Sequence, residues 1–298
     1  CYTIHMKLIA QVKLLITPGQ SDALKCTIET ANAACDYLSE QAWDAKTFGQ
    51  YSLHKLAYHE TRRQFPTLSS QVIVRCIARV ADAYKLDRRA RRTFKPYGAI
   101  AYDDRILRWY VDRSEVSIWA VGGRQHIPFT CGDRQRALLQ HRQGETDLVY
   151  HRGEFYLAAT CNVEEPPTQV VDDALGVDFG IVNIAVDSDG EVHVGNHVNN
   201  VRHRQRRLRA KLQSKGTKSA KRLLKHLAGK EQRFAKNANH VISKHIVAKA
   251  QCTKRAIAIE DLSRIRTRIK ARRQQRATLH SWSFFQLRSF IQYKARLV

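Results

Sequence analysis

The sequence lacks several features that would assign it to common protein classes. No apolar run approaches the roughly 18 residues that a membrane-spanning helix needs, and the opening residues lack the basic-then-apolar pattern of a signal peptide. The seven cysteines include no C-x-x-C pair, so neither a zinc finger nor a disulfide framework is predicted. The 13 histidines include no His-Glu-x-x-His pattern. We therefore expect a soluble, cytoplasmic protein with no membrane partner.

Acidic residues are scarce in the last third of the chain. The whole sequence of 298 residues has 51 Lys and Arg against 27 Asp and Glu, a formal net charge of +24. Residues 200–298 account for this excess, because they hold 28 Lys and Arg against 3 Asp and Glu. Repulsion at this charge density must be offset by an anionic partner, most commonly a nucleic-acid backbone. A membrane surface fits less well, since no continuous bulky apolar face accompanies the charge, and a merely solvated basic surface is the remaining alternative.

The hydrophobic pattern predicts a mixed chain of class α+β or α/β, built in two parts. Residues 1–20 and 93–168 have the two-residue period of strands and are expected to form one antiparallel β domain. Residues 21–92 have a helical period and are expected to form a bundle inserted in that domain. Pro166 and Pro167 then mark a boundary.

A second domain is predicted over residues 169–298. It should begin with a β-hairpin or meander whose turn is formed by Asp187 and Asp189. Residues 198–251 are predicted to form two basic helices with Phe234 in their apolar stripe, followed by a short strand. Residues 281–295 are predicted to form a last helix capped by Ser281, with its aromatic residues in the core.

Two carboxylates are predicted inside apolar strands of this second domain. Asp178 lies within the segment GVDFG at residues 176–180, and Glu260 ends the segment AIAIE at residues 256–260. A carboxylate in an apolar interior is costly unless it is paired or binds a cation, and two adjacent ones are usually neutralised by Mg²⁺ or Mn²⁺. Beside a strongly basic surface, the pair predicts two-metal phosphodiester hydrolysis. The alternative is that each acid sits at a strand end and faces solvent or an arginine.

These segments resemble the motifs of TnpB proteins. Residues 176–183 (GVDFGIVN) are similar to the first motif of a RuvC-type, RNase H-like nuclease domain, and residues 257–262 (IAIEDL) are similar to the second. Further similar segments are residues 239–244 (NHVISK), 280–287 (HSWSFFQL) and 293–295 (YKA). TnpB proteins, also known as OrfB-type transposases, are transposon-encoded, RNA-guided DNA endonucleases related to compact type V CRISPR effectors.

The resemblance implies a role for each part of the chain. The β domain would be a wedge domain, the inserted bundle a recognition lobe, and residues 169–298 a RuvC domain with an inserted basic helical hairpin. Asp178 and Glu260 would be catalytic ligands of Mg²⁺ or Mn²⁺, and the partners would be a guide RNA and a double-stranded DNA target, in a prokaryotic cytoplasm and associated with the nucleoid. The basic residues expected to contact nucleic acid are Arg88, Arg89, Arg91, Arg92, Arg204, Arg206, Arg207, Arg209, Lys211, Lys221, Arg222, Lys225, Arg266, Arg268, Lys270, Arg272 and Arg273.

The sequence departs from the TnpB pattern at its C-terminal end. The family's third carboxylate, an Asp, and its zinc ribbon of two C-x-x-C pairs are absent. We expect C-terminal truncation to explain both, which would leave the nuclease inactive or impaired and would confine Zn²⁺ to the missing ribbon. Asp261, next to Glu260, is interpreted as a structural or supporting residue because it should point to the opposite strand face.

Two alternative functions remain open on the sequence. The first is a nuclease-inactive RNA- and DNA-binding protein derived from the same family. The second is an actin-like or sugar-kinase-like ATPase, which shares the Asp-x-Gly opening but should also have a second Asp-Gly phosphate loop and a Gly-rich adenosine segment. Neither of these two ATPase features occurs in the sequence.

Overall fold

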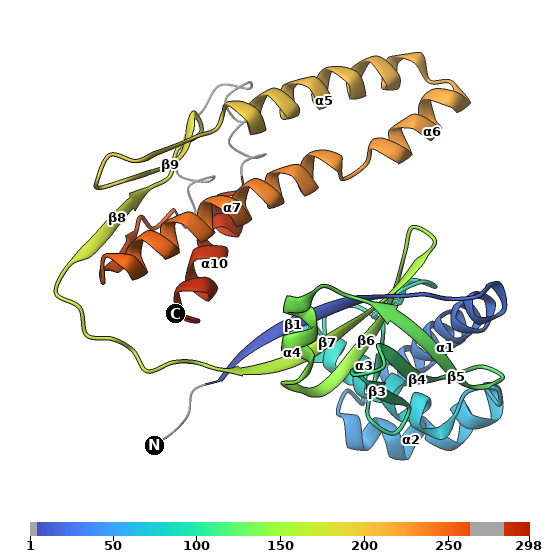
Figure 1. Cartoon of the computed structure of the whole chain (residues 1–298). Coiled ribbons are helices and arrows are strands. Elements are labelled where there is room, and N and C mark those ends of the chain that lie inside the picture. Colours follow the sequence, from blue (N-terminus) through green and yellow to red (C-terminus); the bar gives the residue numbers. More distant parts are fainter. Residues whose placement is uncertain (1–4, 263–282) are drawn as a thin grey trace. The chain divides into compact units, whose positions relative to one another are not determined.

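The computed structural model describes residues 5–262 and 283–298, and it divides the chain into two compact units, Cys1–Glu164 and Glu165–Val298 (Figure 1). Helices and strands occur in both units, which confirms a mixed α and β fold with an antiparallel sheet. Among the described residues, no helix combines the length and the apolar character needed to cross a membrane.

A seven-stranded antiparallel sheet forms the first unit, in the order β2-β6-β7-β1-β5-β4-β3. The central strand β1 pairs with β7 from His5↔Glu164 to Lys13↔Tyr156, and its end pairs with β5. Along β1 the buried residues Ala10, Val12 and Leu14 alternate with exposed ones, as expected for a strand with one face on a core. The strands are β1 (His5–Leu14), β2 (Ile100–Tyr102), β3 (Leu107–Tyr110), β4 (Glu115–Ala120), β5 (Gly123–Thr130), β6 (Arg142–His151) and β7 (Glu154–Glu164).

Three helices follow β1 in the chain, and a fourth, α4 (Asp133–Leu139), follows β5. They are α1 (Pro18–Asp44), α2 (Gln50–Gln64) and α3 (Ser70–Leu86). Helix α1 begins three residues earlier than the predicted start at residue 21. Thr17 and Gln20 form a capping box, in which each side chain accepts a hydrogen bond from the other residue's backbone N–H. Pro18 adds a φ that suits the first helical turn.

The buried side chain of Asn32 connects α1 to the segment at residues 96–98. Its amide donates to the carbonyls of Ile28, Pro96 and Gly98 at 2.8, 3.2 and 2.9 Å, and its oxygen accepts from Arg79 at 2.8 Å. Because Asn32→Ala would leave these buried groups unpaired, we expect it to lower the free energy of unfolding by about 2 kcal/mol.

Chemical denaturation followed by circular dichroism checks this expectation for Asn32. Gln64→Ala, at an exposed position near the end of α2, is the matched control and should leave the transition midpoint nearly unchanged. Equal midpoints for the two variants would show that the Asn32 contacts add nothing to stability.

A four-stranded sheet organises the second unit, in the order β10-β9-β8-β11. Strands β8 (Ala174–Asp178), β9 (Asn183–Asp187) and β10 (Val192–Val194) pair antiparallel, whereas β11 (Ala256–Ile259) pairs parallel to β8. The core of this unit consists of inward side chains of the sheet and of helices α7 (Lys230–Cys252) and α10 (Phe284–Ala295). Its most buried members are Leu175, Ala185, Ile246, Leu287 and Ile291.

Three helices, not the predicted two, lie between β10 and β11 in the chain. Helix α5 (Asn196–Lys215) ends at Gly216, within the predicted turn, but a second break separates α6 (Lys218–Leu227) from α7 (Figure 1). That break falls at Gly229, whose φ of 77° favours glycine. The last helix, α10, begins after Ser283 and not at the predicted residue 281, and Ser281 lies outside the described residues.

Candidate functional site

Asp178 and Glu260 lie side by side at one edge of the smaller sheet. Asp178 is the last residue of β8, and Glu260 directly follows β11. The parallel register pairs Ile259 with Val177, so the next residues on the two strands are Glu260 and Asp178. The two side chains are close enough to interact, since the negative charge of Asp178 acts on Glu260. Two carboxylates 82 positions apart in the sequence are therefore adjacent at the carboxyl ends of parallel strands, which is where α/β sheets place their ligands.

The electrostatics of this pair favour the binding of a positive charge. Partial desolvation raises the pKa of Glu260 above its ordinary value, and the negative charge of Asp178 raises it further. Two adjacent carboxylates repel each other when both are charged, and a bound cation relieves that repulsion. Hard oxygen donors of this kind suit Mg²⁺ or Mn²⁺. Among residues 5–262 and 283–298, no group of three or more His, Cys, Asp or Glu side chains is arranged to hold a metal ion.

The environment of the two carboxylates differs from the predicted one. Leu175 and Val177 are the buried residues of β8, while Asp178 points away from that core and is exposed, as is Glu260. The prediction of carboxylates inside apolar strands is wrong, because each strand ends at the acid. They also do not face only solvent or arginine, since each has the other as its neighbour.

Gly180 forms the close turn that follows Asp178. A Cβ atom at this position would lie 2.6 Å from the carbonyl oxygen of Asn183, a distance that real Cβ atoms do not tolerate. The glycine in the Asp-Phe-Gly segment is thus required by the approach of two backbones, and it lets the chain turn so that β9 pairs back with β8, where Val186 lies opposite Asp178.

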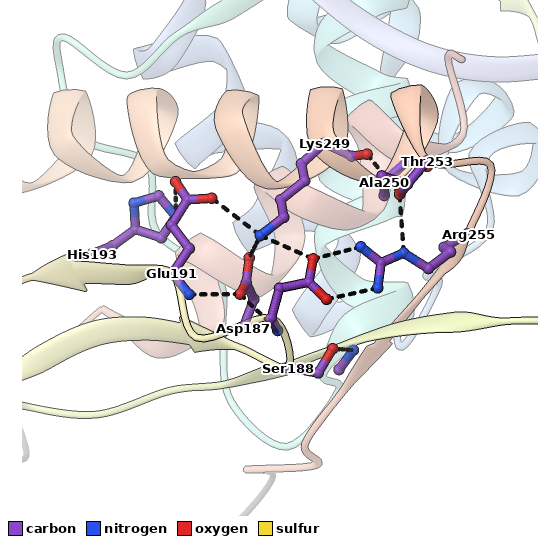
Figure 2. A network of polar contacts seen from close by, with 10 residues as sticks. Asp187, Ser188, Glu191, His193, Lys249, Ala250, Thr253 and Arg255 are labelled. Atoms are coloured by element: carbon purple, nitrogen blue, oxygen red, sulfur yellow. Dashed lines mark hydrogen bonds and ion pairs between the residues drawn. The ribbon is translucent and has the colours of Figure 1, made fainter.

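A network of ion pairs joins the β9–β10 turn to the end of α7 (Figure 2). The Nζ atom of Lys249 contacts Asp187 at 2.5 Å, Asp189 at 3.1 Å and Glu191 at 3.2 Å. The side chain of Asp187 is 1% exposed. Burial alone would raise the pKa of Asp187, but the hydrogen bonds from Lys249 and from the backbone N–H groups of Glu191 and Asp189 lower it below its ordinary value. Asp187 is therefore a buried, fully engaged carboxylate.

The same turn is attached to both strands that carry the carboxylate pair. Asp189 accepts two hydrogen bonds from Arg255, the residue directly before β11, at 2.9 and 2.5 Å. Ser188 donates its backbone N–H to the carbonyl of Gly176 in β8 and accepts the N–H of Gly176 on its hydroxyl. The aspartates do lie in a turn, as predicted, but their partners in α7 and β11 give them a second role, which is to hold the sheet together.

The predicted nucleic-acid contacts divide into three groups. The first group is the predicted contact residues on α5 and α6, which are all exposed: Arg204, Arg206, Arg207, Arg209, Lys211, Lys221, Arg222 and Lys225. In the first unit, Arg88 and Arg89 are exposed, while Arg91 pairs with Glu40 at 3.1 Å and Arg92 pairs with Asp87 at 2.9 Å. A third set lies outside the described residues: Arg266, Arg268, Lys270, Arg272 and Arg273. The structure thus places the described exposed charge on α5 and α6 more than around Arg91 and Arg92.

Residues next to the carboxylate pair and in the last helix follow the prediction only in part. Asp261 pairs with Arg288 of α10 at 2.7 Å, which fits the supporting role expected of it. Phe284 is buried and Phe290 stacks on His240 at 3.9 Å between ring centroids. Phe285 is 83% exposed, so it does not belong to the core that was expected for these aromatics.

Comparisons with known proteins agree with the sequence motifs. A family model described as "Probable transposase", OrfB_IS605, matches residues 158–267, a range that contains both carboxylates. A TnpB-like protein of Methanocaldococcus jannaschii is 33% identical over 98 residues. That match covers 33% of this chain and about a third of the length of the relative, 35%.

A solved structure shares the fold of the chain. It is the cryo-EM structure of a complex of Cas12f1 with sgRNA and target DNA, and it matches with a TM-score of 0.57 at 13% sequence identity. The match covers 93% of this chain and 70% of the Cas12f1 chain. At this identity the likeness concerns the fold alone. The transposase family model and the relative show that part of this chain is similar to TnpB-type proteins.

Proposed function

We propose that this protein is a metal-dependent, RNA-guided DNA endonuclease of a mobile genetic element. The observation that carries the proposal is the Asp178–Glu260 pair, whose two side chains interact at the carboxyl ends of two parallel strands. Two carboxylates placed side by side repel each other when both are charged. A cation bound by both carboxylates would neutralise their charges and remove the repulsion.

Asp178 and Glu260 are the residues that would hold Mg²⁺ or Mn²⁺. A bound ion of this kind would lower the pKa of an attacking water and stabilise the leaving oxygen of a phosphodiester. The two carboxylates would orient the ion against the scissile phosphate, and the surrounding sheet would keep their spacing fixed. We further propose that the second unit is an RNase H-like domain, which the parallel β8–β11 pair and its two carboxylates support.

Guide RNA and target DNA are the proposed partners. The exposed arginines and lysines of α5 and α6 can contact phosphates without reading bases, which suits a heteroduplex whose sequence is defined by base pairing. The structural neighbour Cas12f1 was solved with sgRNA and target DNA, and its fold supports the same classes of partner here.

A cleavage assay tests the proposed activity. The protein is purified with the RNA that it retains, that RNA is sequenced, and a DNA duplex that matches it is offered with Mg²⁺, with Mn²⁺ or with EDTA. We expect cleavage with either metal and none in EDTA. Cleavage that persists in EDTA would contradict the role of the carboxylate pair.

A second candidate function is guided binding without cleavage. It is favoured by one observation, that among the residues which the structure describes no group of three or more His, Cys, Asp or Glu side chains could hold a metal ion. In the same assay, this function predicts retained RNA and stable binding of matching DNA, with the duplex left intact in every metal condition.

A further inference from the structure

A hollow of about 440 Å³ lies on the second unit between α5 and α7. Helix α5 lines it with His197, Asn200, His203, Arg204 and Arg207, and α7 contributes Phe234. The spacing of these α5 residues places His197, Asn200, Arg204 and Arg207 on neighbouring turns of one helix face. The volume falls within the range of about 300–1,000 Å³ typical of small-molecule sites, so it is large enough for one nucleotide unit.

Phe234 is the aromatic part of this hollow. The sequence places it in the apolar stripe of the basic helices, but its side chain is 40% exposed and lines the hollow. No other aromatic ring stacks on it within the part of the chain that the structure describes. Among the described residues, the exposed part of this ring is therefore open to a flat ligand.

Two of the arginines that line the hollow with Phe234 have no acidic partner among the described residues. Glu231, one turn earlier on α7, is the nearest acid along that helix, and it is shared by Arg202 at 3.6 Å and Arg209 at 3.7 Å. Arg204 and Arg207 are exposed and form no ion pair with any described residue. An anionic ligand would complement this pair of guanidinium groups, and a phosphodiester provides the required charge on both sides of a base.

A recessed ring of this kind selects unpaired bases over duplex. In a duplex the faces of the bases are covered by their neighbours, so a side chain inside a hollow cannot stack on them, whereas a base of a single strand can turn out of its stack. We propose that the hollow binds one unpaired nucleotide of a single-stranded nucleic acid, with Phe234 stacked on the base and Arg204 and Arg207 bound to the flanking phosphates. This inference rests on the proposed function for its class of partner, and it adds a contact to single strand that the phosphate-binding helices alone do not provide.

Binding of two nucleic-acid probes to the whole chain tests the site. Fluorescence anisotropy is recorded with a labelled oligouridylate and with a blunt RNA duplex of equal length, both in EDTA so that cleavage plays no part. Phe234→Leu is expected to weaken oligouridylate binding about fivefold or more and to leave duplex binding unchanged. Phe234→Tyr keeps the ring and should keep the affinity. Arg204→Gln and Arg207→Gln should each weaken oligouridylate binding and flatten its salt dependence by about one phosphate contact.

Matched variants separate the site from general effects. Phe285→Leu removes an aromatic ring that is 83% exposed on α10, and Lys244→Gln removes an exposed charge of α7 away from the hollow. Neither should change oligouridylate binding, and melting curves should be the same for all variants.

Three results would contradict the proposed nucleotide site in the hollow. Unchanged oligouridylate affinity in Phe234→Leu, or an equal loss for the duplex, would overturn the proposal. Displacement of the probe by an acidic peptide to the same extent in the unsubstituted chain and in Phe234→Leu would also overturn it and would indicate a protein partner. If the unsubstituted chain binds neither probe, the nucleic-acid partner of the proposed function fails as well, whereas binding that ignores Phe234 removes this site alone.

Discussion

Replacing Asp178 with Asn is expected to reduce metal-dependent DNA cleavage at least about a thousandfold. The substitution keeps the size of the side chain but removes one of the two negative charges that would hold the ion at the edge of the sheet. Glu260→Gln should have the same effect for the same reason, since the two side chains are adjacent and act on one site. Cleavage rates with saturating Mg²⁺, together with Mn²⁺ binding followed by electron paramagnetic resonance, measure the loss.

The stability of these variants distinguishes a metal site from a structural pair. Without metal, two adjacent carboxylates repel each other, and the pKa of Glu260 is raised in the folded chain. Neutralising either one should therefore leave the melting temperature of the metal-free protein equal or higher. Asp261→Asn, at the neighbouring position that pairs with Arg288, is the control and should retain cleavage. A marked fall in melting temperature for Asp178→Asn would indicate a structural role for this carboxylate instead.

Asp187→Ala is expected to destabilise the second unit by about 3 kcal/mol. The buried carboxylate of Asp187 accepts hydrogen bonds from Lys249 and from the backbone N–H groups of Asp189 and Glu191. Its removal leaves these donors without their acceptor at a side-chain position that is 1% exposed. Thermal and chemical unfolding of the whole chain, followed by circular dichroism, would reveal the change as an earlier transition.

The pH dependence of unfolding gives this prediction a second readout. Because the pKa of Asp187 is lowered in the folded state, its stabilising contribution is present above the ordinary Asp pKa of about 3.9 and is lost as the pH falls through the lower folded value. The unsubstituted chain and Asp187→Ala should therefore converge in stability only in strong acid. Glu191→Ala is the comparison and should destabilise the chain less, since its carboxylate is 48% exposed and pairs with Lys249 at 3.2 Å. A constant difference down to the lowest pH would mean that the charge of Asp187 does not stabilise the fold.

From the sequence one can predict which two carboxylates lie together, but not that their side chains are exposed to solvent. Asp178 and Glu260 can be found because each ends a short apolar run within a recognisable motif, and the parallel pairing of β8 and β11 places them together. Their exposure could not be predicted, because a run of apolar residues does not indicate where the strand stops.

Contacts between distant residues account for the features that the sequence did not reveal. Lys249 and Asp187 are 62 positions apart, and nothing in the local pattern of either residue indicates the other. Phe234 fits an apolar stripe by its spacing. The second helix break, at Gly229, starts a separate helix α7, and the ring of Phe234 on that helix lines a hollow. In contrast, the early start of α1 could have been read locally, because Thr17, Pro18 and Gln20 form a recognisable helix start.

The parallel pairing of β8 with β11 has a consequence for how variable this protein can be. The chain leaves the sheet after β10, runs through α5, α6 and α7, and returns to add β11 beside β8. The entropy of closing such a loop grows only with the logarithm of its length, so that a doubling costs about 0.6 kcal/mol. Helices α5 and α6 can therefore lengthen, shorten or change sequence at little cost to the register that brings Asp178 and Glu260 together. The surface of these helices can therefore change while the carboxylate pair stays fixed.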